Sequence, residues 1–216
     1  MDASSVNPTG MRRQPRQVRS QERVNRILDV AAELFMTEGY GATTTNAIAK
    51  GAKVSIGSLY QFFPDKAAIL QALALRYGEL LHQRLSALDP VDMAQLPLPI
   101  YVDRIIDITD QFFSEHPGYY AIFMEVQGTM PELDAIEAEA DAELMEDMIL
   151  SLSHRNAALD RADYEAIAFV LVKAIGTLLW LALGQEKSFR QRLVTETKRL
   201  TLHYLQSYFS VRDNLS

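Results

Sequence analysis

The chain has 216 residues, 48% of them hydrophobic, and a formal net charge of −7. This apolar content excludes a disordered chain, and the absence of cysteine excludes disulfides, thiolate zinc sites and cysteine nucleophiles. Residues 1–88 carry eleven Lys/Arg against seven Asp/Glu, whereas residues 89–216 carry ten against twenty-one. A basic N-terminal part can therefore hold phosphates while the acidic remainder faces away from a polyanion.

Residues 1–18 contain prolines and serines and lack helical periodicity, which predicts a disordered arm. Its basic residues Arg12, Arg13 and Arg16 fit two alternatives equally: an arm that contacts phosphates or a minor groove, or a solvated tail. No apolar stretch of a secretory signal is present here, so we expect a cytoplasmic protein.

The segment Ser20–Glu38 has apolar residues at a 3.6-residue period, which predicts a helix that ends at Gly39. Its face would pack beneath the two short helices that follow, because two such helices alone bury too little surface to fold. Arg19, just before it, is a candidate for phosphate contact.

The next segment predicts a helix-turn-helix, in which the second helix enters a DNA major groove. Thr44 or Thr45 can cap the first helix, and residues 51–53 turn the chain. Ser55 is a natural N-cap for the second helix, and Pro64 ends it near Phe63.

The second helix has two distinct faces. Leu59, Phe62 and Phe63 share the face expected in the core. The other face carries polar and small groups on only about two turns, more than a packing helix needs. It includes Ile56, Gly57, Tyr60 and Gln61. Gly57 costs roughly 1 kcal/mol of helix propensity relative to alanine, which close approach of a sugar-phosphate strand would explain.

The segment Ile48–Leu70 closely resembles, almost position for position, the signature of the TetR family of transcriptional regulators. The resemblance covers roughly residues 20–70 and combines turn, aromatic pair, proline and lysine in a fixed order. One departure is Lys53, where the family often has glycine. This predicts a left-handed backbone at Lys53 and adds a charge near DNA.

The expected DNA contacts divide into two groups. Base edges would be read by Ile56, Ser58 and Gln61, with Gln61 suited to adenine and Ile56 to a thymine methyl group. Phosphates would be held by hydroxyls, a close backbone and the first turn of the following helix: Thr44, Thr45, Ser55, Gly57, Tyr60 and Lys66.

Beyond residue 66 the chain shows only helical patterns, without strand alternation or internal repeats. We expect a long helix to about Ala87, a connection over Asp89–Pro99, and then five helices: Ile100–Glu115, Gly118–Gly128, Pro131–Arg155, Asp160–Gly184 and Ser188–Phe209. The prediction is an all-α protein of about nine or ten helices. Its parts would be an arm over residues 1–18, a DNA-binding domain over 19–66, and a ligand-binding and dimerisation domain over 67–216.

The apolar stretch Ala166–Gly184 has the composition of a membrane span, but Lys173 lies at its centre. A charge there costs roughly 2.5–3.5 kcal/mol, so we expect a buried helix and no membrane insertion. Ala174 and Gly176 allow close approach, and an apolar stripe follows on the next helix. The last two helices could therefore form a four-helix interface of a homodimer; the alternative is a purely intramolecular core.

The resemblance implies that the C-terminal domain holds a small-molecule effector whose binding alters DNA affinity. Aromatic, methionine and isolated polar residues are the candidates to line such a pocket, although most residues of this kind are ordinary core. They are Tyr77, Phe112, His116, Tyr119, Phe123, Met124, Met145, Lys173 and Trp180. Lys173 would need an acidic residue or an anionic ligand if buried, or would extend to the surface.

Two other classes of function fit the sequence less well. A carboxylate-bridged metal enzyme needs Glu-x-x-His on two helices, and only Glu79 with His82 matches. A helical adaptor would use the N-terminal part for protein contact. The polar face of the second helix and the division of charge along the chain argue against an adaptor. The sequence thus favours a dimeric, effector-responsive regulator, most often a repressor by family tendency, that binds double-stranded operator DNA without a cofactor or metal.

Overall fold

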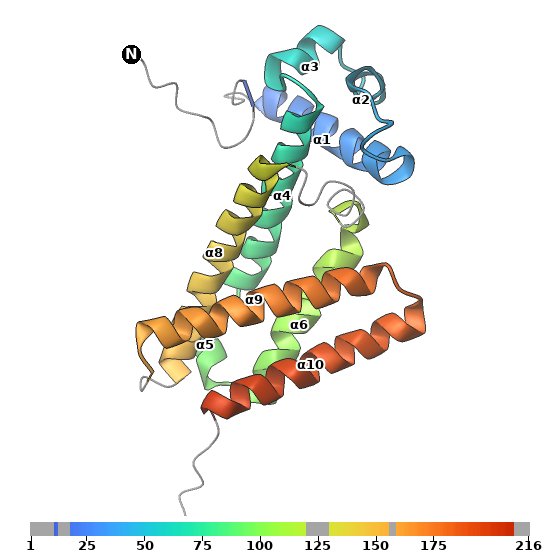
Figure 1. Cartoon of the computed structure of the whole chain (residues 1–216). Coiled ribbons are helices and arrows are strands. Elements are labelled where there is room, and N and C mark those ends of the chain that lie inside the picture. The colour runs from blue at the N-terminus through green and yellow to red at the C-terminus, as the bar shows by residue number, and fades with distance from the viewer. Residues whose placement is uncertain (1–10, 13–17, 120–129, 156–158, 210–216) are drawn as a thin grey trace, which may run out of the picture. The chain divides into compact units, whose positions relative to one another are not determined.

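The computed structural model describes residues 11–12, 18–119, 130–155 and 159–209. These residues form helices joined by short turns, and no strand occurs among them (Figure 1). The all-α class predicted from the sequence is therefore confirmed.

The chain divides into two compact units, which we describe separately. Unit 1 comprises residues 1–79 and 116–139, and unit 2 comprises residues 80–115 and 140–216. No pattern in the sequence indicated that residues 116–139 belong with the N-terminal part.

Unit 1 is built on three helices that share one core, together with the start of a fourth. They are α1 (Val18–Glu38), α2 (Thr45–Gly51), α3 (Ile56–Phe62) and the first part of α4 (Lys66–Ser86). α1 packs on α2, and α2 on α3. The largest fully buried side chains here include Ile27, Phe35, Ile48, Leu59 and Phe63, together with Ile69, Leu70 and Leu73 of α4. Burial against α1 gives the short helices the apolar contacts they lack alone.

The ends of these helices follow the sequence signals. Gly39 ends α1 in the left-handed region, with φ 83°. Thr44 and Ser55 each accept a backbone N–H at the start of α2 and α3. Phe63, before Pro64, turns to an extended conformation and ends α3.

Unit 2 contains α5 (Pro90–Gln95), α6 (Leu98–Glu115), α9 (Arg161–Leu183), α10 (Lys187–Phe209) and part of α8 (Pro131–Arg155). α6, α9 and α10 pack against one another, and Figure 1 shows α9 and α10 running side by side. Arg155 fastens α8 to α5 by donating to the carbonyls of Leu96 (2.7 Å) and Met93 (2.9 Å). Burial raises the pKa of the neighbouring Tyr101 to about 12, although Ser151 and Arg155 act in the opposite direction.

The structure changes one predicted segment and leaves most of another outside the described residues. The stretch Asp89–Pro99, predicted as a connection, contains the short helix α5, because Asp89 caps it and Pro90 starts it. The helix predicted over Gly118–Gly128 lies mostly outside the described residues.

Within the part of the chain that the structure describes, α9 is the one helix long and apolar enough, by length and composition, to cross a membrane. Core helices of soluble proteins pass the same test, and α9 packs on α6 and α10. Only 33% of its apolar window is buried within the chain, so α9 has a second, open face.

Candidate nucleic-acid interface

The face of α3 turned away from the core is open. Leu59 and Phe62 are buried, as predicted, whereas Ile56 is 37% and Tyr60 is 40% exposed. Gln61 and Gly57 are also exposed. A seven-residue helix thus buries one face in unit 1 and offers an aromatic hydroxyl, an amide and an aliphatic group on the other.

Gly57 is not required by the fold of the chain. A Cβ built at this position would meet no atom within 4 Å, and Gly57 does not have a positive φ. Neither internal packing nor backbone geometry therefore explains a residue that lowers helix propensity. The open space permits another surface to approach the backbone of α3.

The hydroxyl groups around α3 keep donors for an outside acceptor. Thr44 Oγ1 accepts from Ala47 N, and Ser55 Oγ accepts from Ser58 N, each at 3.1 Å. A capping hydroxyl accepts through a lone pair, so its own hydrogen stays available. Thr45 Oγ1 and Tyr60 Oη lie 3.1 Å apart, and only one of them can donate to the other. One hydroxyl hydrogen of this pair can therefore reach a phosphate.

Lys53 lies in the turn between α2 and α3 with φ 54°, which confirms the left-handed backbone predicted for it. Among the described residues, Lys53 is the only one other than glycine with a positive φ. Its N–H donates to Lys50 O (3.2 Å), and its side chain is exposed. The turn thus presents a cation where the family often has glycine.

Lys66 differs from its predicted role. Its ammonium group donates to the carbonyl oxygens of Tyr40, Gly41 (3.3 Å) and Thr43 (2.9 Å), and it lies 4.3 Å from the centroid of the Tyr40 ring. An ammonium has three hydrogens, and these carbonyls account for all three. The phosphate contact expected of Lys66 therefore lacks a free donor, and no local signal marked the partners in the loop.

The basic arm contacts α3 at one described point. The N–H of Arg12 donates to Phe62 O at the end of α3, at 2.8 Å, and the Arg12 side chain is exposed. Arg19 is exposed near the start of α1. Arg13 and Arg16 lie outside the described residues.

The residues predicted to line an effector pocket are divided between the two units. In unit 1 the ring of Tyr77 lies 5.5 Å from that of His116 and 5.4 Å from that of Tyr119. Burial raises the pKa of Tyr77, while Arg76 lowers it. Phe112, Met145, Lys173 and Trp180 lie in unit 2, and Phe123 and Met124 lie outside the described residues. The aromatic group around Tyr77 is the part of the set that the structure brings together.

Lys173 is not buried. Its side chain is 46% exposed, and its ammonium pairs with Asp141 of α8. Of the two alternatives predicted for Lys173, extension to the surface is the one observed, and an acidic residue pairs with it there. His82 also faces α8, with Nδ1 3.7 Å from Glu143 and 3.8 Å from Asp147. In the described part of the chain no group of three or more histidine or acidic side chains could hold a metal ion.

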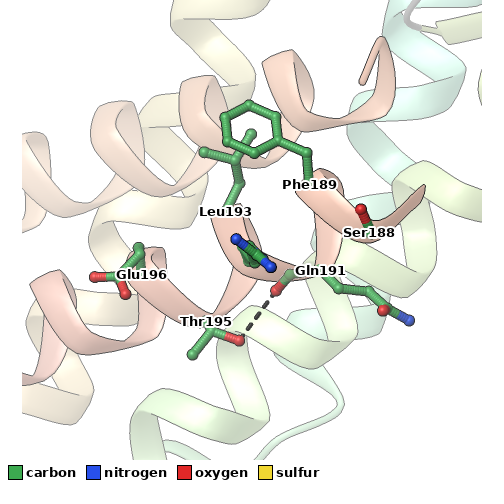
Figure 2. A pocket seen from close by; sticks show the side chains of 7 residues that line it. Ser188, Phe189, Gln191, Leu193, Thr195 and Glu196 are labelled. Atoms are coloured by element: carbon green, nitrogen blue, oxygen red, sulfur yellow. Dashed lines mark hydrogen bonds between the residues drawn. The ribbon is translucent and has the colours of Figure 1, made fainter. Parts of the chain in front are cut away.

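A second open surface follows α9 and α10 in unit 2. Large apolar side chains on it are about half exposed: Phe169, Val170, Leu181, Phe189, Leu200 and Tyr208. Gly176 lies in α9, and a Cβ there would meet no atom within 4 Å. α10 borders a hollow of about 550 Å³, and Figure 2 shows the side chains around it. The hollow is lined by residues of that one helix: Ser188, Phe189, Gln191, Arg192, Leu193, Thr195 and Glu196.

A capped pair of short helices, packed on a third helix and open on one face of the second, defines a helix-turn-helix DNA-binding module. Residues 27–73 match the family model for bacterial regulatory proteins of the tetR family. Residues 97–205, half of the chain, match the model for the tetracyclin repressor-like C-terminal domain. The chain belongs to the TetR family of transcriptional regulators.

Known proteins of similar sequence and fold support the assignment to this family. The chain is 29% identical over 170 residues to the HTH-type transcriptional regulator YhgD of Bacillus subtilis, covering 74% of this chain and 84% of the relative. It is 28% identical over 179 residues to the transcriptional activator FasR of Mycolicibacterium smegmatis, covering 81% and 79%. A TetR-family regulator from Streptomyces coelicolor superposes with a TM-score of 0.60, 26% identity, and 86% and 98% coverage. Two further curated relatives match over only 39% and 53% of their own lengths.

Proposed function

We propose that this protein is a homodimeric, effector-responsive repressor in the cytoplasm, and that it acts by binding operator DNA and not as an enzyme. The observation that carries the proposal is the open face of α3, with exposed Ile56, Tyr60 and Gln61 around a glycine that the fold does not require. Two such helices, related by a two-fold axis, would enter successive major grooves. Half-sites of a pseudo-palindromic operator would then lie roughly 34 Å or somewhat more apart.

The contacts to DNA follow from what α3 and its surroundings expose. Ile56, Ser58 and Gln61 would meet base edges, because a glutamine amide can pair with adenine and an aliphatic group can pack on a thymine methyl. Hydroxyls and close backbone would position the phosphates, from Thr44, Thr45, Ser55, Gly57 and Tyr60. Lys53 would add a cation at the turn.

The arm is proposed to take part through Arg12. Its backbone is fastened to the last turn of α3 by the hydrogen bond to Phe62, so its exposed guanidinium starts close to the reading helix. With α3 in a major groove, the Arg12 side chain could reach a phosphate or the edge of the adjacent minor groove. The anchored backbone favours this role over a solvated tail.

The dimer is proposed to form through the open surface of α9 and α10. Exposed Phe169, Phe189 and Leu200 are each at least half exposed in the single chain, which is costly in water unless another surface covers them. A two-fold interface brings the same patch of both protomers together, and two helices from each would make a four-helix bundle. Gly176 would let the backbones approach closely.

The effector is proposed to be a small molecule that binds better to the conformation unable to span both half-sites. Only this difference in affinity can move the equilibrium away from DNA. The aromatic group of Tyr77, His116 and Tyr119 lies on and beside α4, the helix that directly follows the helix-turn-helix, and is the first place to probe.

The test is fluorescence anisotropy of the purified protein on DNA flanking its own gene, against a scrambled duplex, at several salt concentrations. We expect tight binding of one duplex that weakens steeply with salt, because phosphate contacts release counterions. No preference between the duplexes, for protein that is folded, dimeric and refolded free of bound ligand, would contradict the proposal and favour a protein-binding adaptor. A reporter gene fused to the bound DNA then separates repression from activation.

A further inference from the structure

Lys66 is the first residue of α4, yet its side chain is committed to a loop more than twenty residues earlier in the chain. The ammonium donates to Tyr40 O, Gly41 O and Thr43 O, all in unit 1. The ammonium nitrogen also lies over the Tyr40 ring, 4.3 Å from its centroid. A cation over an aromatic ring adds to the attraction of three carbonyl dipoles, so this group is held from several directions.

The loop that Lys66 holds leads directly into the DNA-binding helices. Thr43 is buried, and both its N–H and its hydroxyl donate to Gly39 O, at 3.2 Å and 2.8 Å. The next residue, Thr44, caps α2. Thr45, the first residue of α2, shares a hydrogen bond with Tyr60 of α3. Hydrogen bonds and adjacent residues of the chain therefore connect the start of α4 to the face of α3.

The start of α4 is itself fixed. Asp65 accepts the N–H of Ala68 at 2.8 Å, which caps the first turn. Ile69 and Leu70 in the next turn are fully buried. Lys66 thus joins the capped start of α4 to a hydrogen-bonded loop, and its removal would take one shared donor group away from three carbonyl oxygens.

We propose that Lys66 is a positioning residue for operator binding: it holds the helix-turn-helix to the start of α4 and acts on DNA affinity through this loop, not through a phosphate. The inference rests on the proposed DNA-binding function. Its consequence is that the charge of Lys66 contributes nothing to the salt dependence of binding, because a cation that meets no phosphate releases no counterion.

The experiment uses the full-length protein and a duplex that wild type selects from a random pool. Anisotropy gives affinity as a function of salt for wild type, Lys66→Met and Lys53→Met. We expect Lys66→Met to bind at least about tenfold more weakly with an unchanged slope of log affinity against log salt. Lys53→Met is the matched control, an exposed lysine whose loss from both protomers should reduce the slope by about 1.8.

Each other result has a distinct meaning. A slope reduced in Lys66→Met as in Lys53→Met would make Lys66 a phosphate ligand and overturn the inference. A lower melting temperature with unchanged affinity would leave it a merely structural residue and also overturn it. Failure of wild type to select any sequence would contradict the proposed function before any variant is measured.

Lys66→Arg keeps the inference testable if Lys66→Met does not fold. A planar guanidinium keeps the charge and can bind phosphate, but it cannot converge on three carbonyls as a compact ammonium does. We expect Lys66→Arg to bind the selected duplex about tenfold more weakly with the wild-type slope. Wild-type affinity in this variant would contradict a positioning role.

Discussion

The open face of α3 and the open surface of α9 and α10 both combine exposed apolar side chains with a helical glycine. A Cβ at Gly57 in α3, or at Gly176 in α9, would meet no atom within 4 Å. Gly51 in α2 is different, because a Cβ there would lie 2.6 Å from Val30 Cγ1. Gly51 therefore serves packing within the chain, whereas Gly57 and Gly176 leave room for another molecule.

The kind of molecule follows from what surrounds each glycine. α3 has seven residues, and its neighbours are hydroxyls and the exposed cations Lys50 and Lys53. α9 and α10 have 23 residues each and expose large aliphatic and aromatic groups. A short polar face beside cations suits a phosphate strand, and a long apolar surface suits a second protein surface. Empty space alone shows only that something can approach.

The largest expected effect tests the α9–α10 surface. Leu200→Glu places a charge on both sides of the proposed interface, and we expect the dimer dissociation constant to rise at least about hundredfold, because a buried unpaired charge costs several kcal/mol. Analytical ultracentrifugation measures it. Leu150→Glu on α8, at a similar exposure, is the matched control and should stay dimeric. Dimers of equal strength in both variants would remove this surface from the interface.

The next effect tests the α3 face with one substitution that should raise fold stability and lower DNA affinity. Gly57→Ala should stabilise the fold by about 0.5–1 kcal/mol, because alanine favours the helix and meets no atom. The same methyl group should weaken operator binding about tenfold by keeping the backbone from the DNA strand. Urea denaturation and anisotropy give the two values.

Gly51→Ala is the internal control for Gly57→Ala. Its Cβ would press on Val30, so we expect a loss of stability of about 1–3 kcal/mol. Unchanged DNA affinity in a more stable Gly57→Ala would show that no molecule approaches the backbone of α3 there.

A third effect separates base reading from phosphate contact on the same face. Gln61→Ala should lose about 1–3 kcal/mol of discrimination at one base position, while Lys53→Ala should weaken all sequences alike. Anisotropy on a set of singly substituted duplexes gives the pattern. Equal losses on every duplex for both variants would contradict the assignment of Gln61 to a base edge.

The smallest effect concerns the turn that carries Lys53. Because its φ is 54°, Lys53→Gly should be more stable than Lys53→Ala by about 1 kcal/mol, although both lose the charge. Chemical denaturation measures the difference. Equal stability would mean that the turn relaxes around alanine without strain.

The local features of the fold were predictable from the sequence. Periodicity and capping residues act over a few positions, and they predicted the bounds of α8, the caps Thr44 and Ser55, and the left-handed Lys53. The alternating faces of α3 followed from the same 3.6-residue period.

Contacts between distant positions were not predictable. Lys66 was assigned to phosphate because it begins a helix, and nothing local indicates that carbonyls from residues 40–43 converge on it. The apolar neighbours of Lys173 left open whether it is buried or extends to the surface, and the structure shows it about half exposed and paired with Asp141. Hydrophobic composition indicates that a helix packs against other elements. Which of its faces is buried is known only once the packing partners are known.

The most direct test of the central claim is selection of duplexes from a random pool by the purified wild-type protein, followed by sequencing. Two α3 helices on a two-fold axis predict an enriched inverted repeat whose half-sites lie about one helical turn or somewhat more apart. The same base substitution at matching positions of the two half-sites should weaken binding by the same factor, since the protomers are identical. No enrichment, or an enriched site without inverted symmetry, would contradict a dimer that reads DNA through two copies of α3.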